Sequence, residues 1–269
     1  MSTDLNLPGP ESGYIATFGS GDPHTLFGHG FAGAIRDTRP FGTGITGTRH
    51  FLHLPGHGGR PSPGPGWNYP QIAEVLAEAL RATSASRALG VSMSAGGLLH
   101  LLSTAHPVTA DLDRIALVLP ASFTGFSAEV AEANRSHLER LRSLVAAEDI
   151  DGIVDLMLSR EPAEVAQMPP ARSWTRSKAE NLVRTDMSDG LGLALEIAVD
   201  DTSESAENLR DFAGEVLVLT HEDDPAHPVE VAEAIHAAIP GSDLEVLPAR
   251  SILWRGRQEV RGILGEFFG

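Results

Sequence analysis

Seven short apolar segments recur along the chain and constrain its fold more than any other feature of the sequence. Most are near-continuous runs of Val, Leu, Ile and Ala that end in Gly, Pro or a small polar residue: YIATFG, TLFGHG, RHFLHLPG, SRALGVS, RIALVLP, EVLVLT and LEVLP. Such runs are typical of strands buried on both faces of a sheet. Helical patterns separate several of them, as in YPQIAEVLAEALRA from Tyr69 and HPVEVAEAIHAAI from His227. This alternation predicts an α/β fold with a mostly parallel central sheet flanked by helices.

The alternation stops between about Ser122 and Ala213, where the sequence is mostly helical in pattern. A helical insertion before the last two strands is typical of a cap over one end of a sheet. The length of 269 residues suits one domain with such an insertion. We therefore predict a core domain formed by residues 1–121 and 214–269 and a helical cap insertion at residues 122–213.

Charge and composition narrow the classes of partner. The formal net charge of −16 would repel a phosphate backbone or an anionic membrane surface, so we expect a small-molecule substrate or ligand and neither a nucleic acid nor a membrane. The chain has no cysteine, which excludes thiol nucleophiles and thiolate metal sites. The start, MSTDLNLPGPESG, does not resemble a signal peptide, and no apolar run is long enough to span a membrane. We expect a cytoplasmic protein.

Eleven histidines raise the question of a metal site. His50, His53 and His57 are close in sequence, but residues three apart on a strand point to opposite faces of the sheet, and His57 falls in a predicted loop. No HExxH or HxHxD pattern occurs. We expect neither a metal nor a cofactor.

The segment SRALGVSMSAGGLLHLL requires a strand to turn into a helix within two or three residues. A serine on such a turn has a strained backbone and exposes its hydroxyl beyond the end of the sheet, as a nucleophile requires. The pattern G-x-S-x-G describes this turn, and Gly90 and Ser92 match it, whereas Ser94 stands in place of the second glycine. Centring the motif on Ser94 is the alternative, but that choice loses the first glycine.

Four motifs in order resemble the α/β-hydrolase family over nearly the whole chain. They are GHGF at 28–31, LHLPGHGGRP at 52–61, GVSMSAGG, and VLTHEDDPAHPVEVAEAI. The resemblance implies a nucleophile elbow at Ser92 and an oxyanion hole formed by the amides of Phe31 and Met93. It also implies that the acid of a catalytic triad is Asp224, with Asp223 as the alternative.

The resemblance further implies a histidine after the last strand, where the acid orients one ring nitrogen and the other accepts the serine proton. That stretch, LEVLPARSILWRGRQEVRG, contains no histidine, and the family's spacing puts Ile252 or Ser251 in its place. We therefore expect a base recruited from elsewhere, with His29 and His227 as the leading candidates. The other candidates are His100, His137, Lys178 and His221.

Two classes of function follow. The first is a hydrolase acting through Ser92 on an ester, lactone or related acyl compound, with Gly30, Trp174, Ser251 and Ile252 in its substrate pocket. The second is a non-hydrolytic member of the family that lacks a working triad: a small-molecule binder, an accessory protein or a lyase- or cyclase-type catalyst. A histidine nitrogen within about 3.2 Å of the serine hydroxyl would favour the first class.

Overall fold

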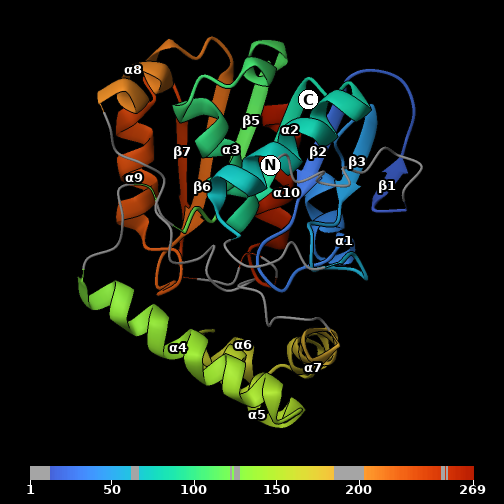
Figure 1. Ribbon diagram of the computed structural model, residues 1–269, viewed down its shortest axis with the longest axis vertical. Coiled ribbons are helices and arrows are strands. Elements are labelled where there is room, and N and C mark those ends of the chain that lie inside the picture. The colour runs from blue at the N-terminus through green and yellow to red at the C-terminus, as the bar shows by residue number, and fades with distance from the viewer. Residues whose placement is uncertain are drawn as a thin grey trace, which may run out of the picture.

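A seven-stranded sheet forms the centre of the computed structural model, which describes residues 13–61, 67–121, 123, 128–184, 203–249, 252 and 254–269 (Figure 1). The strand order is β1-β3-β2-β4-β5-β6-β7, and every pair is parallel except β1 with β3. The strands are β1 (Ile15–Phe18), β2 (His24–Gly28), β3 (Thr48–Leu52), β4 (Arg87–Val91), β5 (Arg114–Val118), β6 (Glu215–His221) and β7 (Asp243–Leu247). Each of the seven apolar segments overlaps one of them, which confirms the predicted sheet.

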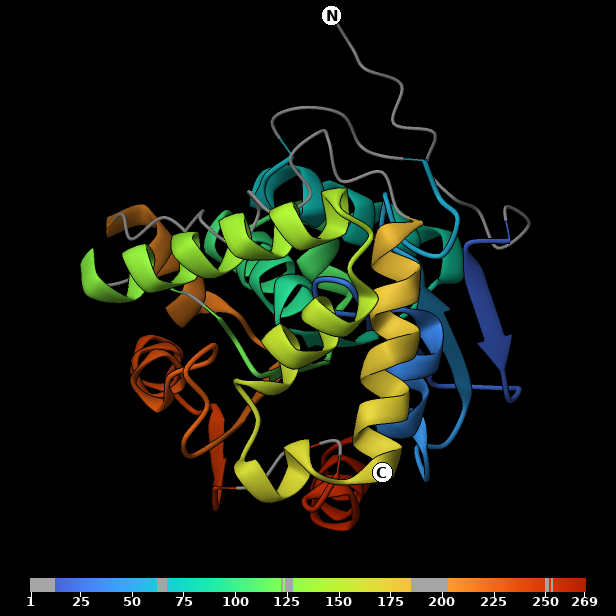
Figure 2. The same ribbon diagram turned by 90° about the horizontal axis from the view of Figure 1, so that it is seen from below.

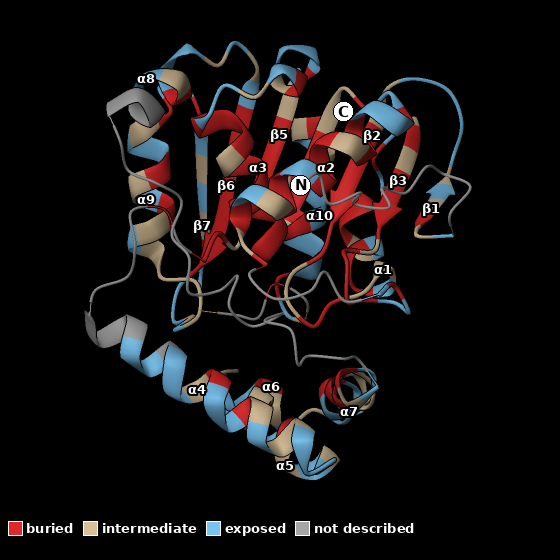
Figure 3. Ribbon diagram, viewed as in Figure 1, coloured by how far each residue is buried: buried red, intermediate tan, exposed pale blue. Residues whose placement is uncertain are grey.

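Helices cover both faces of the sheet, because alternate residues of each central strand point to opposite sides. In β5, Ile115 and Leu117 pack in one core cluster, and Ala116 and Val118 pack in the other. Buried residues continue along the central strands (Figure 3). The first face is covered by α2 (Tyr69–Thr83), α3 (Met93–Ser103), α8 (Ser203–Asp211) and α9 (Val229–Ala238), and the second by α1 (Ile35–Thr38), a 3₁₀ helix (Arg39–Gly42) and α10 (Arg257–Phe268).

The longest helix on the sheet, α2, shows how the sequence determines these elements. The Asn68 side chain accepts a hydrogen bond from the Gln71 amide, and the Gln71 side chain accepts one from the Asn68 amide, each at 3.1 Å, which closes a capping box at the helix start. Ile72, Leu76 and Leu80 then recur at helical spacing and are fully buried.

No helix in the described part of the chain has the length and apolar character that a membrane span requires.

Four of the described helices between β5 and β6 lie beyond the carboxyl ends of the strands (Figures 1 and 2). They bury an apolar cluster of their own that includes Leu141, Ile153 and Leu182. The helix α8 also falls in the range predicted as cap, but it packs on the sheet side, where the Asn208 side-chain amide donates to the Ser103 carbonyl at 2.8 Å. The cap helices are α4 (Ala128–Ala146), α5 (Ile150–Leu158), α6 (Ala163–Ala166) and α7 (Pro169–Val183). The bounds 122–213 stay a prediction, because residues 185–202 lie outside the described part.

Candidate active site

Ser92 occupies a sharp turn between β4 and α3. Its backbone angles are φ 49° and ψ −103°, which lie outside the common regions for a residue other than glycine. Its amide donates to the Val118 carbonyl at 2.9 Å, which ties the turn to β5. A Cβ on Gly90 would approach the Ser94 backbone to 2.6 Å, so a side chain at position 90 would block the turn. The side chain of Ser92 is thereby presented to the cavity beyond the sheet.

The residue that departs from the usual pattern, Ser94, has a contact of its own. Its side chain is fully buried, and its hydroxyl donates to the His29 carbonyl at 2.6 Å. The first turn of α3 is therefore attached to the segment that leaves β2. Because this hydroxyl is directed away from the cavity and is already bonded, Ser92 is the serine placed for chemistry.

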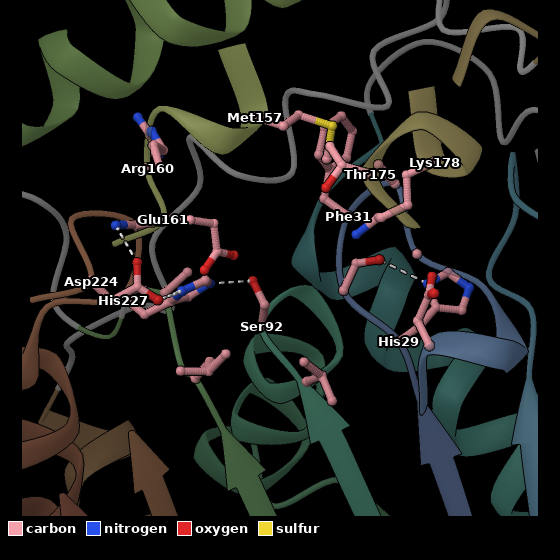
Figure 4. A pocket seen from close by; sticks show the side chains of 18 of the residues that line it. His29, Phe31, Ser92, Met157, Arg160, Glu161, Thr175, Lys178, Asp224 and His227 are labelled. Atoms are coloured by element: carbon pink, nitrogen blue, oxygen red, sulfur yellow. Dashed lines mark hydrogen bonds and ion pairs between the residues drawn. The ribbon is translucent and has the colours of Figure 1, made fainter. Parts of the chain in front are cut away.

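His227 connects Ser92 to Asp224 (Figure 4). The His227 Nε2 atom lies 2.9 Å from the Ser92 hydroxyl, and its Nδ1 atom lies 2.7 Å from an Asp224 carboxylate oxygen. With Asp224 ionised, Nδ1 carries the proton and donates to the carboxylate, which leaves Nε2 free to accept from the hydroxyl. The serine, the histidine and the carboxylate thus form one continuous chain of hydrogen bonds.

A tight turn after β6 places the acid and the histidine only three residues apart. The Ala226 amide donates to Asp224 Oδ1 at 2.8 Å, and the His227 amide donates to the Asp224 carbonyl at 3.2 Å. Burial raises the pKa of Asp224, but His227, the Ala226 amide and His221 outweigh that effect and hold the pKa well below its ordinary range. The carboxylate is therefore ionised. The alternative acid, Asp223, is exposed and has a positive φ of 59°.

His29, the other leading candidate for the base, has no ring nitrogen left for Ser92. Its Nε2 accepts from the Leu54 amide at 3.0 Å, and its Nδ1 donates to the Gly30 carbonyl at 2.8 Å. Burial, reinforced by neighbouring His57, lowers the pKa of His29 well below its ordinary value. This ring is neutral and joins two loops. Of the two leading candidates, only His227 contacts the serine.

The loop after β2 approaches Ser92 closely. A Cβ on Gly30 would lie 3.1 Å from the Ser92 Cβ, so the absence of a side chain there allows the loop to pass beside the serine. The Phe31 amide follows directly, and Met93 is the first residue of α3, whose amide has no partner within the helix. The oxyanion hole at these two amides stays a prediction that this placement supports.

His57 holds the same loop from the other side. Its Nε2 accepts from the Ala32 amide at 3.1 Å, and its Nδ1 donates to the Pro55 carbonyl at 2.9 Å. Burial is the main cause that lowers the pKa of His57 to about 4. The ring is therefore a neutral bridge between two loops and is not a metal ligand. In the part of the chain that the structure describes, no group of three or more histidine or carboxylate side chains is suited to bind a metal ion.

Ser92 and His227 open into a cavity of about 300 Å³ between the sheet and the cap. Of the predicted pocket residues, Gly30, Trp174 and Ile252 line it, and Ser251 lies outside the described residues. Ile252, at one of the two positions where the family pattern implies a histidine, is buried and adds an apolar wall. Most of the remaining lining is aliphatic or aromatic, including Phe31, Phe41, Leu119, Leu138, Leu141, Met157 and Leu182.

Three charged side chains of the cap also line the cavity: Arg160, Glu161 and Lys178. Glu161 lies on the cap side of His227, and Lys178 lies across the cavity near Phe31 (Figure 4). Sequence reasoning considered Lys178 only as a substitute base, and it did not single out Arg160 or Glu161. The segment between α5 and α6 carries no motif that would have identified them.

Comparisons with known proteins identify the fold. No protein-family model and no curated protein matches the chain. Among solved structures, an esterase from Exiguobacterium antarcticum superposes with a TM-score of 0.72 at 16% identity, covering 95% of this chain and 94% of that one. An enol-lactonase from Burkholderia xenovorans gives 0.70 at 17% identity, covering 93% and 94%. An alpha/beta hydrolase from Sphaerobacter thermophilus gives 0.66 at 18% identity, covering 95% and 96%. The chain therefore has the α/β-hydrolase fold.

Proposed function

We propose that this protein is a serine hydrolase that cleaves an ester, a lactone or a related acyl compound. One observation carries the proposal: the unbroken contact from Asp224 through His227 to the Ser92 hydroxyl, at 2.7 and 2.9 Å. The solved structures that share the fold include an esterase and an enol-lactonase, which is consistent with this class of reaction.

The proposed reaction has two stages. In the first, Ser92 Oγ attacks the acyl carbon while His227 Nε2 accepts its proton, and the amides of Phe31 and Met93 stabilise the tetrahedral oxyanion. His227 then returns the proton to the leaving alkoxide, which departs and leaves an acyl-serine. In the second, His227 removes a proton from water as the water oxygen attacks the acyl-serine, and it then returns that proton to Ser92 Oγ as the acid departs. Ionised Asp224 orients the imidazole and stabilises its protonated form. No cofactor takes part in these steps.

The alternative, a family member without a working triad, depends on the missing histidine after β7. The position of His227 supports the hydrolase over that alternative, because this ring makes the same two contacts that a triad histidine requires. Ile252, which has no proton-accepting group, forms part of the wall of the same cavity. His227 is therefore the base that we assign to the reaction.

A fluorophosphonate probe and a short-chain nitrophenyl ester test the proposal on the purified protein. We expect labelling and turnover in the wild type and the loss of both in Ser92→Ala. His227→Gln keeps a polar side chain but removes the base, so we expect kcat to fall at least about a thousandfold. The matched control is His236→Gln, because His236 lies on α9 with its ring bonded to Ser242 at 2.9 Å and does not line the cavity.

The control variant should label and turn over like the wild type. Turnover that persists in Ser92→Ala would contradict the proposal. Activity that survives in His227→Gln would show that another group accepts the proton, and it would leave Ser92 as the nucleophile without its assigned base.

A further inference from the structure

The only lysine of the chain, Lys178, lies on the cavity wall. All other basic side chains except the histidines are arginines. Lys178 comes from α7, and its ammonium group points into the cavity (Figure 4). It lies over the ring of Trp174, 4.5 Å from the ring centroid. A cation is therefore placed inside a mostly apolar chamber that also contains the proposed nucleophile.

Within the described part of the chain, Lys178 forms no ion pair. The neighbouring carboxylate of Asp37 is already bonded to the Ala34 amide at 2.8 Å and to the Trp174 indole N–H at 2.9 Å, and Arg36 lies 3.7 Å from it. Burial lowers the pKa of Lys178, although Asp37 and Glu161 act against that effect. Lys178 is only partly exposed, an ammonium that gives up hydration without an ion-pair partner is costly, and an anionic ligand would offset that cost.

A second donor accompanies the ammonium. Thr175 precedes Lys178 by three residues on α7, so both side chains lie on one face of the helix. Its side chain is buried and lines the cavity, and its hydroxyl forms no hydrogen bond with a described residue. One cation and one hydroxyl donor therefore face the same chamber from adjacent turns. A carboxylate, with two acceptor oxygens and one charge, matches this pair.

We propose that Lys178 and Thr175 bind a carboxylate of the substrate, which is thus an ester or lactone that carries a free carboxylate away from the bond that is cleaved. The inference rests on the proposed function for the reaction at Ser92. The lining of the cavity includes aliphatic side chains such as Leu138, Met157 and Leu182, which suit a short hydrocarbon segment between the two ends. The substrate carboxylate and the Lys178 ammonium carry opposite charges. Lys178 therefore selects substrates with a free carboxylate over neutral ones.

Two esters with the same glutaryl chain test the inference. Nitrophenyl hydrogen glutarate carries the free carboxylate, and nitrophenyl methyl glutarate replaces it with a neutral methyl ester. We expect the wild type to favour the acid, and the ratio of kcat/KM for the acid to that for the neutral ester to fall at least about tenfold in Lys178→Met, mainly through KM. Lys178→Arg keeps a cation and should retain part of the preference.

The control is Arg184→Met, which removes the same charge from the exposed end of α7 and should leave the ratio unchanged. A ratio that is the same in the wild type and in Lys178→Met overturns the inference. Equal losses of kcat/KM for both esters also overturn the inference. They would mean that Lys178 acts on the acyl group that reacts and does not bind a separate carboxylate.

A binding measurement separates this inference from the proposed function. In isothermal titration, monomethyl glutarate should bind Ser92→Ala at least about tenfold more tightly than it binds the double variant Ser92→Ala/Lys178→Met. Dimethyl glutarate should bind weakly to both proteins. Binding to Ser92→Ala that depends on Lys178, together with a wild type that hydrolyses neither ester, would sustain the carboxylate site and refute the hydrolase. Binding of monomethyl glutarate that is indifferent to Lys178 would refute the site itself. Circular dichroism confirms that each variant is folded.

Discussion

His57 makes the stability of the loop beside Ser92 depend on pH. Its Nε2 accepts a hydrogen bond from the Ala32 amide, so only the neutral ring fits its place. Burial is the main cause that lowers the pKa of His57 in the folded protein, from 6.5 to about 4. Protonation would both place a charge among buried groups and remove the acceptor that holds the loop.

The sign and size of the effect follow from the two pKa values. Below pH 6.5 the unfolded chain binds a proton at this residue, and the folded chain does not until the pH approaches 4. The contribution of His57 to the free energy of unfolding is therefore fully present above pH 6.5 and is lost as the pH falls. At about 1.4 kcal/mol per pH unit, the loss between pH 6.5 and pH 4.5 is about 2 kcal/mol.

His57→Gln tests this reasoning, because an amide oxygen can accept from the Ala32 amide but does not titrate. Urea unfolding at pH 7, 5.5 and 4.5 gives the free energy of unfolding of both proteins. We expect the wild type to lose about 2 kcal/mol more than the variant between the first and last pH. His50, whose pKa is also lowered by burial, is not coupled to His57, so it titrates in both proteins and cancels in the difference. Equal losses in the two proteins would refute the argument.

Two further variants test the site. Asp224→Asn removes the negative charge that orients His227, so kcat should fall by about 10⁴ with little change in KM, and near-normal turnover of a nitrophenyl ester would show that the carboxylate has no such role. Ser94→Ala removes the hydrogen bond to the His29 carbonyl and should lower the free energy of unfolding by about 1 kcal/mol in urea titrations, whereas an unchanged midpoint would show that this bond does not contribute to stability.

The fold was predictable because parallel strands buried on both faces leave a simple signal in the sequence. Each of the seven apolar segments overlaps a strand, since strands buried on both faces consist mostly of apolar or small residues. The elbow was predictable for a similar reason. Gly90 is required because a Cβ at that position would lie 2.6 Å from the Ser94 backbone, so only glycine fits.

The base and the charged groups of the cavity left no comparable signal. In the sequence, His227 is a histidine beside a proline in a loop, and His29 is an equal candidate. The structure distinguishes them, because the turn built on Asp224 holds His227 and both ring nitrogens of His29 are bonded to the backbone. The inward direction of Lys178 depends on how α7 docks on the core, and one contact of that docking is the Trp174 indole bonded to Asp37, 137 positions away in the sequence. Contacts of such long range cannot be read from local patterns.

The distance between base and nucleophile matters for the proposed chemistry, and the position of the base along the chain does not. Ser92 follows β4 and His227 follows β6, and these strands are joined through β5 in one parallel sheet that sets the spacing of their carboxyl ends. Because Asp224 and His227 share one turn, the acid and the base move together relative to the serine. Ile252 is then free to be apolar, and the wall that it forms favours the hydrocarbon part of a substrate.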